Sequence, residues 1–318
     1  MNGMVRTVLG ELPVEKMGNT SVHEHLSGAL DKTPPECVPD EKRFVLEELH
    51  RAKEAGLDTL IDVSVCPRLD PDYVQYIAEN SPVNIVTCTG FYCEPWLTEE
   101  EKNFSIEQFM EFILWEAEYG IRGSGILPGV IKIGSFRPTL LPCAVRALTA
   151  AGRAQKITGL PMCVHSSTGT RYQQYLIEAA GADMEKVYFS HLESPTDREN
   201  RTLQMQIDYT EKTMERGSYV SLNGFCYPSY LDPMEPGEIV KQICERGYAH
   251  KMLLSTDWWW KYADGKLWFT YQEKEPESVG VRNWAFLMTH VVPFLREYGV
   301  ADSDLNIMLR DNVYKLFG

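Results

Sequence analysis

The fold is decided by two neighbouring stretches of the sequence, Leu160-Pro161-Met162-Cys163-Val164-His165 and Val187-Tyr188-Phe189-Ser190-His191. Each is a short, mainly apolar run of strand-like composition, and each ends on a histidine. The stretch Arg171–Ala180 between them is predicted to be an amphipathic helix. A strand, a helix and a second strand in this order predict two parallel strands joined by a crossover helix.

The same alternation extends outward in both directions. Strands are predicted at Thr20–His23, Asp58–Val63, Asn84–Thr89, Val130–Ile133, Pro161–His165, Val187–Ser190, Tyr219–Leu222 and Met252–Ser255. Helices are predicted at Asp40–Ala55, Ser105–Tyr119 (with a capping box of Ser105 and Gln108), Leu140–Thr158, Arg171–Ala180, Glu199–Arg216, Pro236–Arg246 and Arg282–Tyr298. This strict alternation predicts an α/β fold, a closed (β/α)₈ TIM barrel, with an open doubly wound sheet as the alternative. The length of 318 residues fits a single domain over residues 1–318.

The composition of the chain indicates which kinds of binding partner and which cellular compartment to expect. The net charge of −14 would repel a phosphate backbone, so nucleic acid is not an expected partner. We find neither a signal peptide at the start nor an apolar run long enough to span a membrane. The eight cysteines include no C-x-x-C pair and are interpreted as reduced thiols. A cytoplasmic protein without a membrane partner is therefore expected.

Three connections that follow predicted strands are unusually long. They are Thr89–Phe104, Asn223–Glu235 and Asp257–Gly280. In a barrel, loops that follow strands gather at the carboxyl ends of the strands, where active sites are built. We therefore expect the functional site at that end.

Four of the seven histidines fall at ends of predicted strands. His23 and His25 are two residues apart, so in an extended strand both side chains face the same side. His165 and His191 each close an apolar run. One such histidine is more often a packed core residue, but four at strand ends predict a metal site, because imidazole is a common ligand.

Two further residues fit the same site. Asp257 closes the last predicted strand and could bind a metal or accept a proton, although an Asp in this place often caps a helix or turn. Lys132 lies within the apolar run Val130–Ile133, where a buried ammonium is costly. It must be paired, neutral or chemically modified, or else reach the solvent from the strand end.

These motifs together resemble the phosphotriesterase family of the amidohydrolase superfamily. The matching segments are Gly18-Asn19-Thr20-Ser21-Val22-His23-Glu24-His25-Leu26, Thr89-Gly90-Phe91-Tyr92, Gly129-Val130-Ile131-Lys132, Val164-His165, Ser190-His191, Ser255-Thr256-Asp257 and the tail from Val292 to Asn312. The similarity runs from about Thr7 to Phe317, nearly the whole chain.

The resemblance implies a site for two divalent metal ions. One metal would be held by His23, His25 and Asp257, the other by His165 and His191, and both by Lys132 as N6-carboxylysine. Zinc is the expected metal, and manganese, cobalt or iron would fit the same ligands. A hydroxide between the two metals would attack the substrate, with Asp257 taking its proton. Family members are often dimers, so a homodimer is a further expectation.

The substrate is expected to be a small molecule, a lactone or carboxylic ester, with phosphotriester hydrolysis as a promiscuous activity. Tyr92 occupies the place at which lactonases of the family hold a tyrosine beside the substrate. Candidate residues of the substrate pocket are Trp258, Trp259, Phe225, Tyr227, Arg137 and Lys261. The aromatic residues would otherwise form a hydrophobic lid, and the two cations would otherwise be surface charges.

Three other functions remain open from the sequence. They are a deaminase or amidase with a single metal, a barrel that binds without catalysis, and a metal-dependent nuclease. Lys132 argues against the first, because a bridging ligand needs two metals. The intact ligand set argues against the second, and the net charge of −14 argues against the third.

Overall fold

Parallel strands form the centre of the protein. The computed structural model describes residues 3–26, 41–65, 69–136, 139–166, 170–193, 202–225, 235–263, 266–269 and 283–318, without the side chains of 261–263 and 266–269. The central strands are β3 (Thr20–Glu24), β4 (Thr59–Asp62), β5 (Asn84–Val86), β6 (Cys88–Gly90), β7 (Val130–Gly134), β8 (Met162–His165), β9 (Val187–Ser190), β10 (Tyr219–Leu222) and β11 (Met252–Leu254). Their order is β3-β4-β5 in one sheet and β6 through β11 in the other, with every pair parallel.

The two sheets join into one closed barrel. β5 and β6 are a single strand position interrupted at Thr87, since β5 pairs with β4 and β6 pairs with β7. At the other seam, the N–H of Asp257 donates to the carbonyl of His23 at 3.1 Å. The N–H of His25 donates to the carbonyl of Trp258 at 3.2 Å. The sequence prediction of a (β/α)₈ barrel is therefore confirmed.

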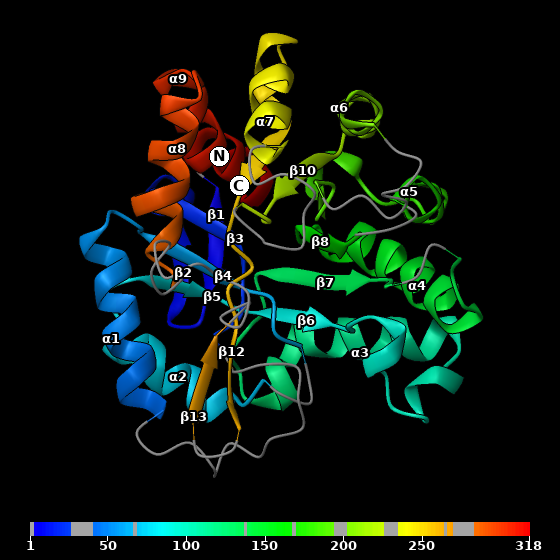
Figure 1. Cartoon of the computed structure of the whole chain (residues 1–318). Helices are drawn as coiled ribbons and strands as arrows, with labels where there is room; N and C mark the ends of the chain where they lie inside the picture. Colours follow the sequence, from blue (N-terminus) through cyan, green and yellow to red (C-terminus); the bar gives the residue numbers. More distant parts are fainter. Residues whose placement is uncertain are drawn as a thin grey trace.

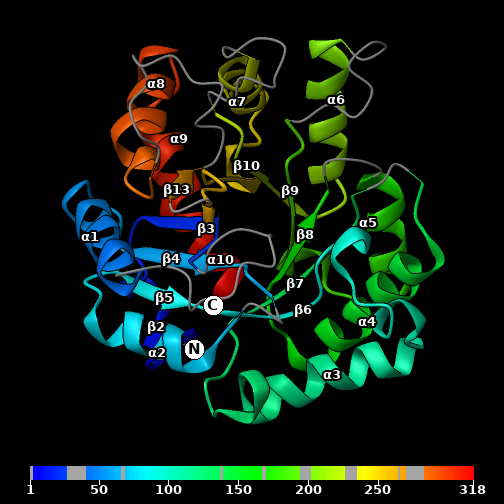
Figure 2. The ribbon, with the colours of Figure 1, turned by 60° about the horizontal axis from the view of Figure 1, so that its bottom comes forward.

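Helices surround the strands (Figures 1 and 2). They are α1 (Glu41–Glu54), α2 (Pro71–Asn80), α3 (Ile106–Tyr119), α4 (Pro142–Thr158), α5 (Thr170–Ala179), α6 (Leu203–Met214), α7 (Glu235–Glu245), α8 (Val292–Glu297), α9 (Asp302–Asn306) and α10 (Asn312–Phe317). Short 3₁₀ turns occupy Val14–Lys16, Glu94–Trp96, Glu101–Asn103, Ile121–Gly123, Met184–Lys186 and Ala249–Lys251, and π-helical turns occupy Leu287–Val291 and Ile307–Asp311. Within the described residues, no helix is long and apolar enough to cross a membrane.

The pleat of the strands decides which side chains reach the barrel interior. Successive residues of a strand face opposite sides. On β7, Ile131 and Ile133 pack outward against the helices, and Lys132 between them faces inward. The neighbouring strand places Cys163 opposite Lys132. The outward side chains form the larger apolar layer between barrel and helices, and this layer anchors the inward residues.

The predicted strands agree with the structure to within one or two residues, and the capping box of Ser105 and Gln108 is present. Residues 40, 199–201 and 282 of three predicted helices lie outside the described part of the chain. Four elements were not predicted: the hairpin of β1 (Met4–Thr7) and β2 (Gly10–Pro13), helix α2, the C-terminal helices from Asp302 to Phe317, and a second hairpin. That hairpin, β12 (Trp260–Ala263) with β13 (Lys266–Phe269), lies within the long connection Asp257–Gly280 that was predicted to follow the last barrel strand.

Candidate metal centre

The six predicted ligands lie at the carboxyl ends of strands around the barrel. His23 lies in β3, Lys132 in β7, and His165 ends β8. His25, His191 and Asp257 follow the strands β3, β9 and β11. This is the end of a (β/α)₈ barrel at which loops of different strands converge. The sequence placement of the site at this end therefore agrees with the geometry.

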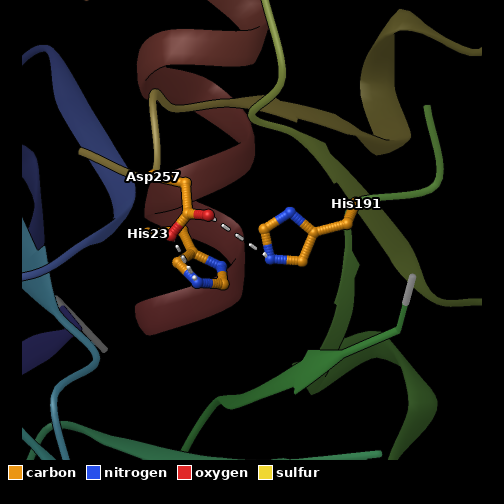
Figure 3. Close-up of side chains that lie close together, drawn as sticks. All are labelled: His23, His191 and Asp257. Carbon is orange, nitrogen blue, oxygen red and sulfur yellow. Dashed lines mark ion pairs between the residues drawn. The ribbon is translucent and has the colours of Figure 1, made fainter. Parts of the chain in front are cut away.

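A single carboxylate faces three imidazoles. One oxygen of Asp257 lies 3.2 Å from Nε2 of His25 and 3.5 Å from Nε2 of His23. The other oxygen lies 3.9 Å from Nε2 of His191. Ligand atoms of His23, His191 and Asp257 all lie within 4.8 Å of one another. Figure 3 shows these three side chains close together. A divalent cation can be held by such a group, because carboxylate and imidazole are its usual ligands.

Lys132 lies beneath this group and is fully buried. Its Nζ lies 3.0 Å from Nε2 of His23 and 3.6 Å from Sγ of Cys163. In the part of the chain that the structure describes, no carboxylate forms an ion pair with it. An ammonium group buried without a carboxylate partner is strongly disfavoured, so a chemically modified Lys132 suits this place better than an unmodified one.

His165 completes the cluster through ring contacts. Its ring centroid lies 4.4 Å from that of His191. Neither ring nitrogen of His165, nor Nε2 of His191, has a hydrogen-bond partner among the described residues, although all three atoms are buried. Buried polar atoms are nearly always satisfied. Unsatisfied imidazole nitrogens beside a carboxylate therefore fit a bound metal ion.

Burial lowers the pKa values of His23, His165 and His191 and so favours their neutral forms. Burial lowers the pKa of His191 to about 4, against the attraction of Asp257, which raises it. Burial and the neighbouring Lys132 place the pKa of His23 well below its ordinary value, and burial and His191 do the same for His165. Burial raises the pKa of Asp257, but the imidazoles of His191 and His25 outweigh this effect and lower it. Neutral imidazole and ionised carboxylate are the forms that bind metal.

The backbone is strained at two of these residues. His191 has a φ of +70° and Asp257 a φ of +48°, and both conformations are uncommon for residues other than glycine. Each is held by a backbone hydrogen bond to the adjacent strand, from the N–H of His191 to the carbonyl of Ser221 and from that of Asp257 to the carbonyl of His23. Such strain clusters at functional sites.

Side chains behind the cluster fix the ring orientations. Ser190 Oγ lies 2.8 Å from Nδ1 of His23, and Ser64 Oγ lies 3.2 Å from Nδ1 of His25. Asn223 Nδ2 lies 3.4 Å from Nδ1 of His191. Glu193 accepts from the backbone N–H groups of Asn223 and Gly224, at 3.0 and 2.7 Å. Contacts of this kind orient metal ligands.

Glu24 was missed by the sequence analysis although it lies between His23 and His25 in the sequence. Its carboxylate is fully buried and accepts hydrogen bonds from the hydroxyl groups of Ser21, Ser255 and Thr256 and from the N–H groups of Thr256 and Trp258. A charged residue inside a buried strand was the available signal, because a buried carboxylate needs several donors.

The predicted pocket residues differ in their burial, and the structure does not describe all of them. Trp258 is buried and packs on Trp284 with centroids 4.7 Å apart, and Phe225 is also buried, while Trp259 is partly exposed. Arg137 and Tyr227 lie outside the described residues, as does the side chain of Lys261. Tyr92 lies beside the cluster, with its ring centroid 5.5 Å from that of His165. Two aromatic residues that the sequence analysis did not select, Trp96 and Phe136, join it there.

Comparisons with known proteins agree with this geometry. The family model described as "Phosphotriesterase family" matches residues 3–317. A "Phosphotriesterase homology protein" of Mycobacterium tuberculosis is 29% identical, over 98% of this chain and 97% of its own length. An "Aryldialkylphosphatase" of Saccharolobus solfataricus is 26% identical, over 95% of both chains, and an "N-acetyltaurine hydrolase" of Rattus norvegicus is 24% identical, over 98% of this chain and 97% of its own.

A solved structure supports the same fold. The crystal structure of the Escherichia coli phosphotriesterase homology protein, complexed with phosphate in its active site, superposes with a TM-score of 0.80. The superposition covers 95% of this chain and 99% of that one, at 24% identity.

Proposed function

The chain belongs to the phosphotriesterase family and is a hydrolase of that family, and we propose that it uses two divalent metal ions to cleave a lactone or a carboxylic ester. The observation that carries this proposal is the position of Asp257, whose carboxylate faces the imidazoles of His23, His25 and His191 above the buried Lys132.

The residues present fit a pair of metals. His23, His25 and Asp257 would hold one ion, and His165 and His191 the other. The unsatisfied nitrogens of His165 and His191 support this assignment. When bound, the metals would supply Lewis acidity and would lower the pKa of water. Zinc is the metal that we propose for these ligands.

Lys132 is proposed to be carboxylated and to serve both metals. Its neutral amine would attack carbon dioxide, and the loss of one proton would leave an anionic carbamate on Nζ. This modification removes the cost of a buried ammonium without a carboxylate partner. The rings of His23 and Tyr92 lie beside Nζ and would orient the carbamate.

Asp257 is proposed as the residue that accepts a proton during hydrolysis. Its pKa lies below the ordinary value, so it is ionised and ready to accept near neutral pH. The strained φ of +48° at Asp257 and the contacts that hold it keep the carboxylate directed toward the three imidazoles. We propose that Tyr92 orients the substrate from the side of His165.

A substrate panel tests the reaction type. It contains γ-lactones, carboxylic esters, an aryl phosphotriester and N-acetyltaurine, since two relatives are named aryldialkylphosphatase and N-acetyltaurine hydrolase. We expect lactones or esters to give the highest kcat/KM, with loss of activity after chelation and recovery with zinc. Metal-dependent turnover confined to the phosphotriester or to N-acetyltaurine would overturn the proposed substrate class.

A single-metal amidase is a second candidate, because three ligand atoms lie within 4.8 Å of one another without any contribution from Lys132. This alternative predicts one ion per chain and a small effect of Lys132 on metal content. It also predicts that N-acetyltaurine or another amide is the preferred substrate.

A further inference from the structure

A buried carboxylate, Glu94, connects two loops at the rim of the barrel. Glu94 begins the 3₁₀ turn Glu94–Trp96 after β6 and is only 2% exposed. One of its oxygens accepts a hydrogen bond from the hydroxyl of Ser135 at 2.5 Å. The other accepts from the backbone N–H of Phe136 at 2.9 Å. The loops after β6 and β7 are therefore held to one another by one side chain.

The two loops place two aromatic rings, Tyr92 and Phe136, against His165 and a third ring, Trp96, against both of them. Tyr92 and Trp96 lie 4.9 Å apart between centroids, and Trp96 and Phe136 lie 5.4 Å apart. Phe136 stacks on His165 at 6.2 Å, and Tyr92 meets the edge of His165 at 5.5 Å. The ring of His165, which has no hydrogen-bond partner among the described residues, is thus held by packing against aromatic rings.

The backbone of Phe136 is held by a hydrogen bond, whereas about half of its side chain is exposed to solvent. Its N–H is bound by a buried carboxylate, yet its side chain is 49% exposed. An exposed phenyl ring forgoes the free energy of burial, and apolar surface beside a reaction centre commonly binds ligand. None of Tyr92, Trp96 and Phe136 carries a charge that could attract an ionic group.

We infer that Tyr92, Trp96 and Phe136 form a subsite for a neutral, apolar, ring-sized group of the substrate, and that Glu94 is the positioning residue that holds Phe136 there. This inference rests on the proposed function, because it concerns the substrate of the same centre. A phenyl or similar substituent next to the scissile group would stack on the exposed face of Phe136 and contact the edge of Trp96.

The kinetic test compares γ-butyrolactone with γ-phenyl-γ-butyrolactone. We expect Phe136→Ala to lower kcat/KM for the phenyl lactone roughly tenfold more than kcat/KM for the unsubstituted lactone. The control is Trp115→Ala, which removes an aromatic ring of similar exposure from the outer helix α3. Equal changes on both lactones in the Phe136 variant would overturn the subsite.

Two variants test the role of Glu94. Glu94→Ala removes both hydrogen bonds and should shift the selectivity in the same way as Phe136→Ala, although Glu94 does not contact the substrate. Glu94→Gln keeps one acceptor oxygen and should restore part of the preference for the phenyl lactone. A Glu94→Ala protein that folds, holds its metal and retains the wild-type preference would contradict the positioning role.

A binding measurement separates the subsite from the reaction. Benzyl alcohol is titrated against the purified protein by ligand-detected NMR, so no turnover is needed. The subsite predicts saturable binding that weakens at least fivefold in Phe136→Ala and is unchanged in Trp115→Ala. If neither lactone is hydrolysed but this binding pattern holds, the proposed function fails and the subsite stands. If benzyl alcohol binds both variants equally, or does not bind, the subsite is wrong.

Discussion

Glu24 accepts a 2.8 Å hydrogen bond from the backbone N–H of Trp258 and thereby joins the first barrel strand to the segment after the last. The same carboxylate accepts from the N–H of Thr256 at 2.9 Å. These two N–H groups belong to the residues on either side of Asp257, so the Glu24 carboxylate holds the backbone on both sides of Asp257. These two hydrogen bonds account for how Asp257 keeps its left-handed φ of +48°.

Glu24→Gln should weaken the hydrogen bonds that hold the backbone on both sides of Asp257. The amide replaces one acceptor oxygen by a donor, so at least one buried N–H or hydroxyl group loses its partner. We expect the free energy of unfolding to fall by about 1–3 kcal/mol. We also expect the metal affinity to fall by about 10–100-fold, as for other residues that orient ligands. Denaturant unfolding and chelator competition measure the two effects.

Glu15→Gln is the matched control, since Glu15 is exposed and undergoes the same chemical change. Its stability and metal affinity should equal those of the unmodified protein. If Glu24→Gln behaves like Glu15→Gln in both measurements, the hydrogen bonds of Glu24 beside Asp257 contribute neither to stability nor to metal affinity.

Gly90→Ala should damage the site through Lys132. Gly90 has a φ of +118°, and a Cβ atom there would lie 2.1 Å from the carbonyl oxygen of Lys132. Gly10 has a similar φ of +110°, but a Cβ atom there would meet nothing within 4 Å. Gly10→Ala therefore measures the backbone strain alone. Gly90→Ala should cost about 1–3 kcal/mol more in unfolding free energy, because of the additional overlap. Equal losses in the two variants would contradict this account.

Asp257→Asn should separate metal binding from turnover. The amide can still offer an oxygen to a metal but cannot accept a proton, so we expect kcat to fall by about 10²–10⁴-fold. Most of the bound metal should remain, as elemental analysis would show. The exposed Asp72, changed to Asn, serves as the control. Undiminished turnover in Asp257→Asn would remove Asp257 from the role of proton acceptor.

Cys244 should react slowly with alkylating reagents. Burial, followed by the charges of Asp304 and Glu245, raises the pKa of the Cys244 thiol to about 12. At pH 8 only about one thiol in ten thousand is then the reactive thiolate. Peptide mass spectrometry after iodoacetamide treatment should show labelling at least 100-fold slower in the native protein than in urea. Labelling at equal rates would mean that this environment does not exist in solution.

The sequence predicts the barrel because the strands repeat a readable pattern. Val187–Ser190 and Tyr219–Leu222 are apolar runs bounded by helical stretches, and their observed limits agree with the prediction. Helix α2 was missed although Asp70 caps it and Pro71 occupies its first turn, signals that sequence reasoning could have used. The hairpin β12–β13 was missed because its aromatic residues were considered only as pocket or lid residues and not as a strand.

The proximity of the six proposed metal ligands was predictable because each lies in or just after a barrel strand, and parallel strands bring such positions together. The contacts between distant residues were not predictable in the same way. Glu94 and Phe136 are 42 positions apart, and Glu24 and Trp258 are 234 positions apart. Which buried carboxylate accepts from which backbone N–H depends on how the barrel closes. The local spacing of apolar and polar residues in the sequence does not predict these pairs.

Metal content per chain tests the central claim most directly. The protein is purified without chelator, with bicarbonate present, and analysed by elemental mass spectrometry beside Lys132→Ala and Lys251→Ala. Lys251 is a buried lysine outside the cluster, paired with Glu185 at 2.7 Å, and serves as the control. The bridged site predicts close to two divalent ions in the unmodified protein and in Lys251→Ala, with a sharp fall in Lys132→Ala. One ion per chain that is unaffected by Lys132→Ala, or none after reconstitution with zinc, would contradict it.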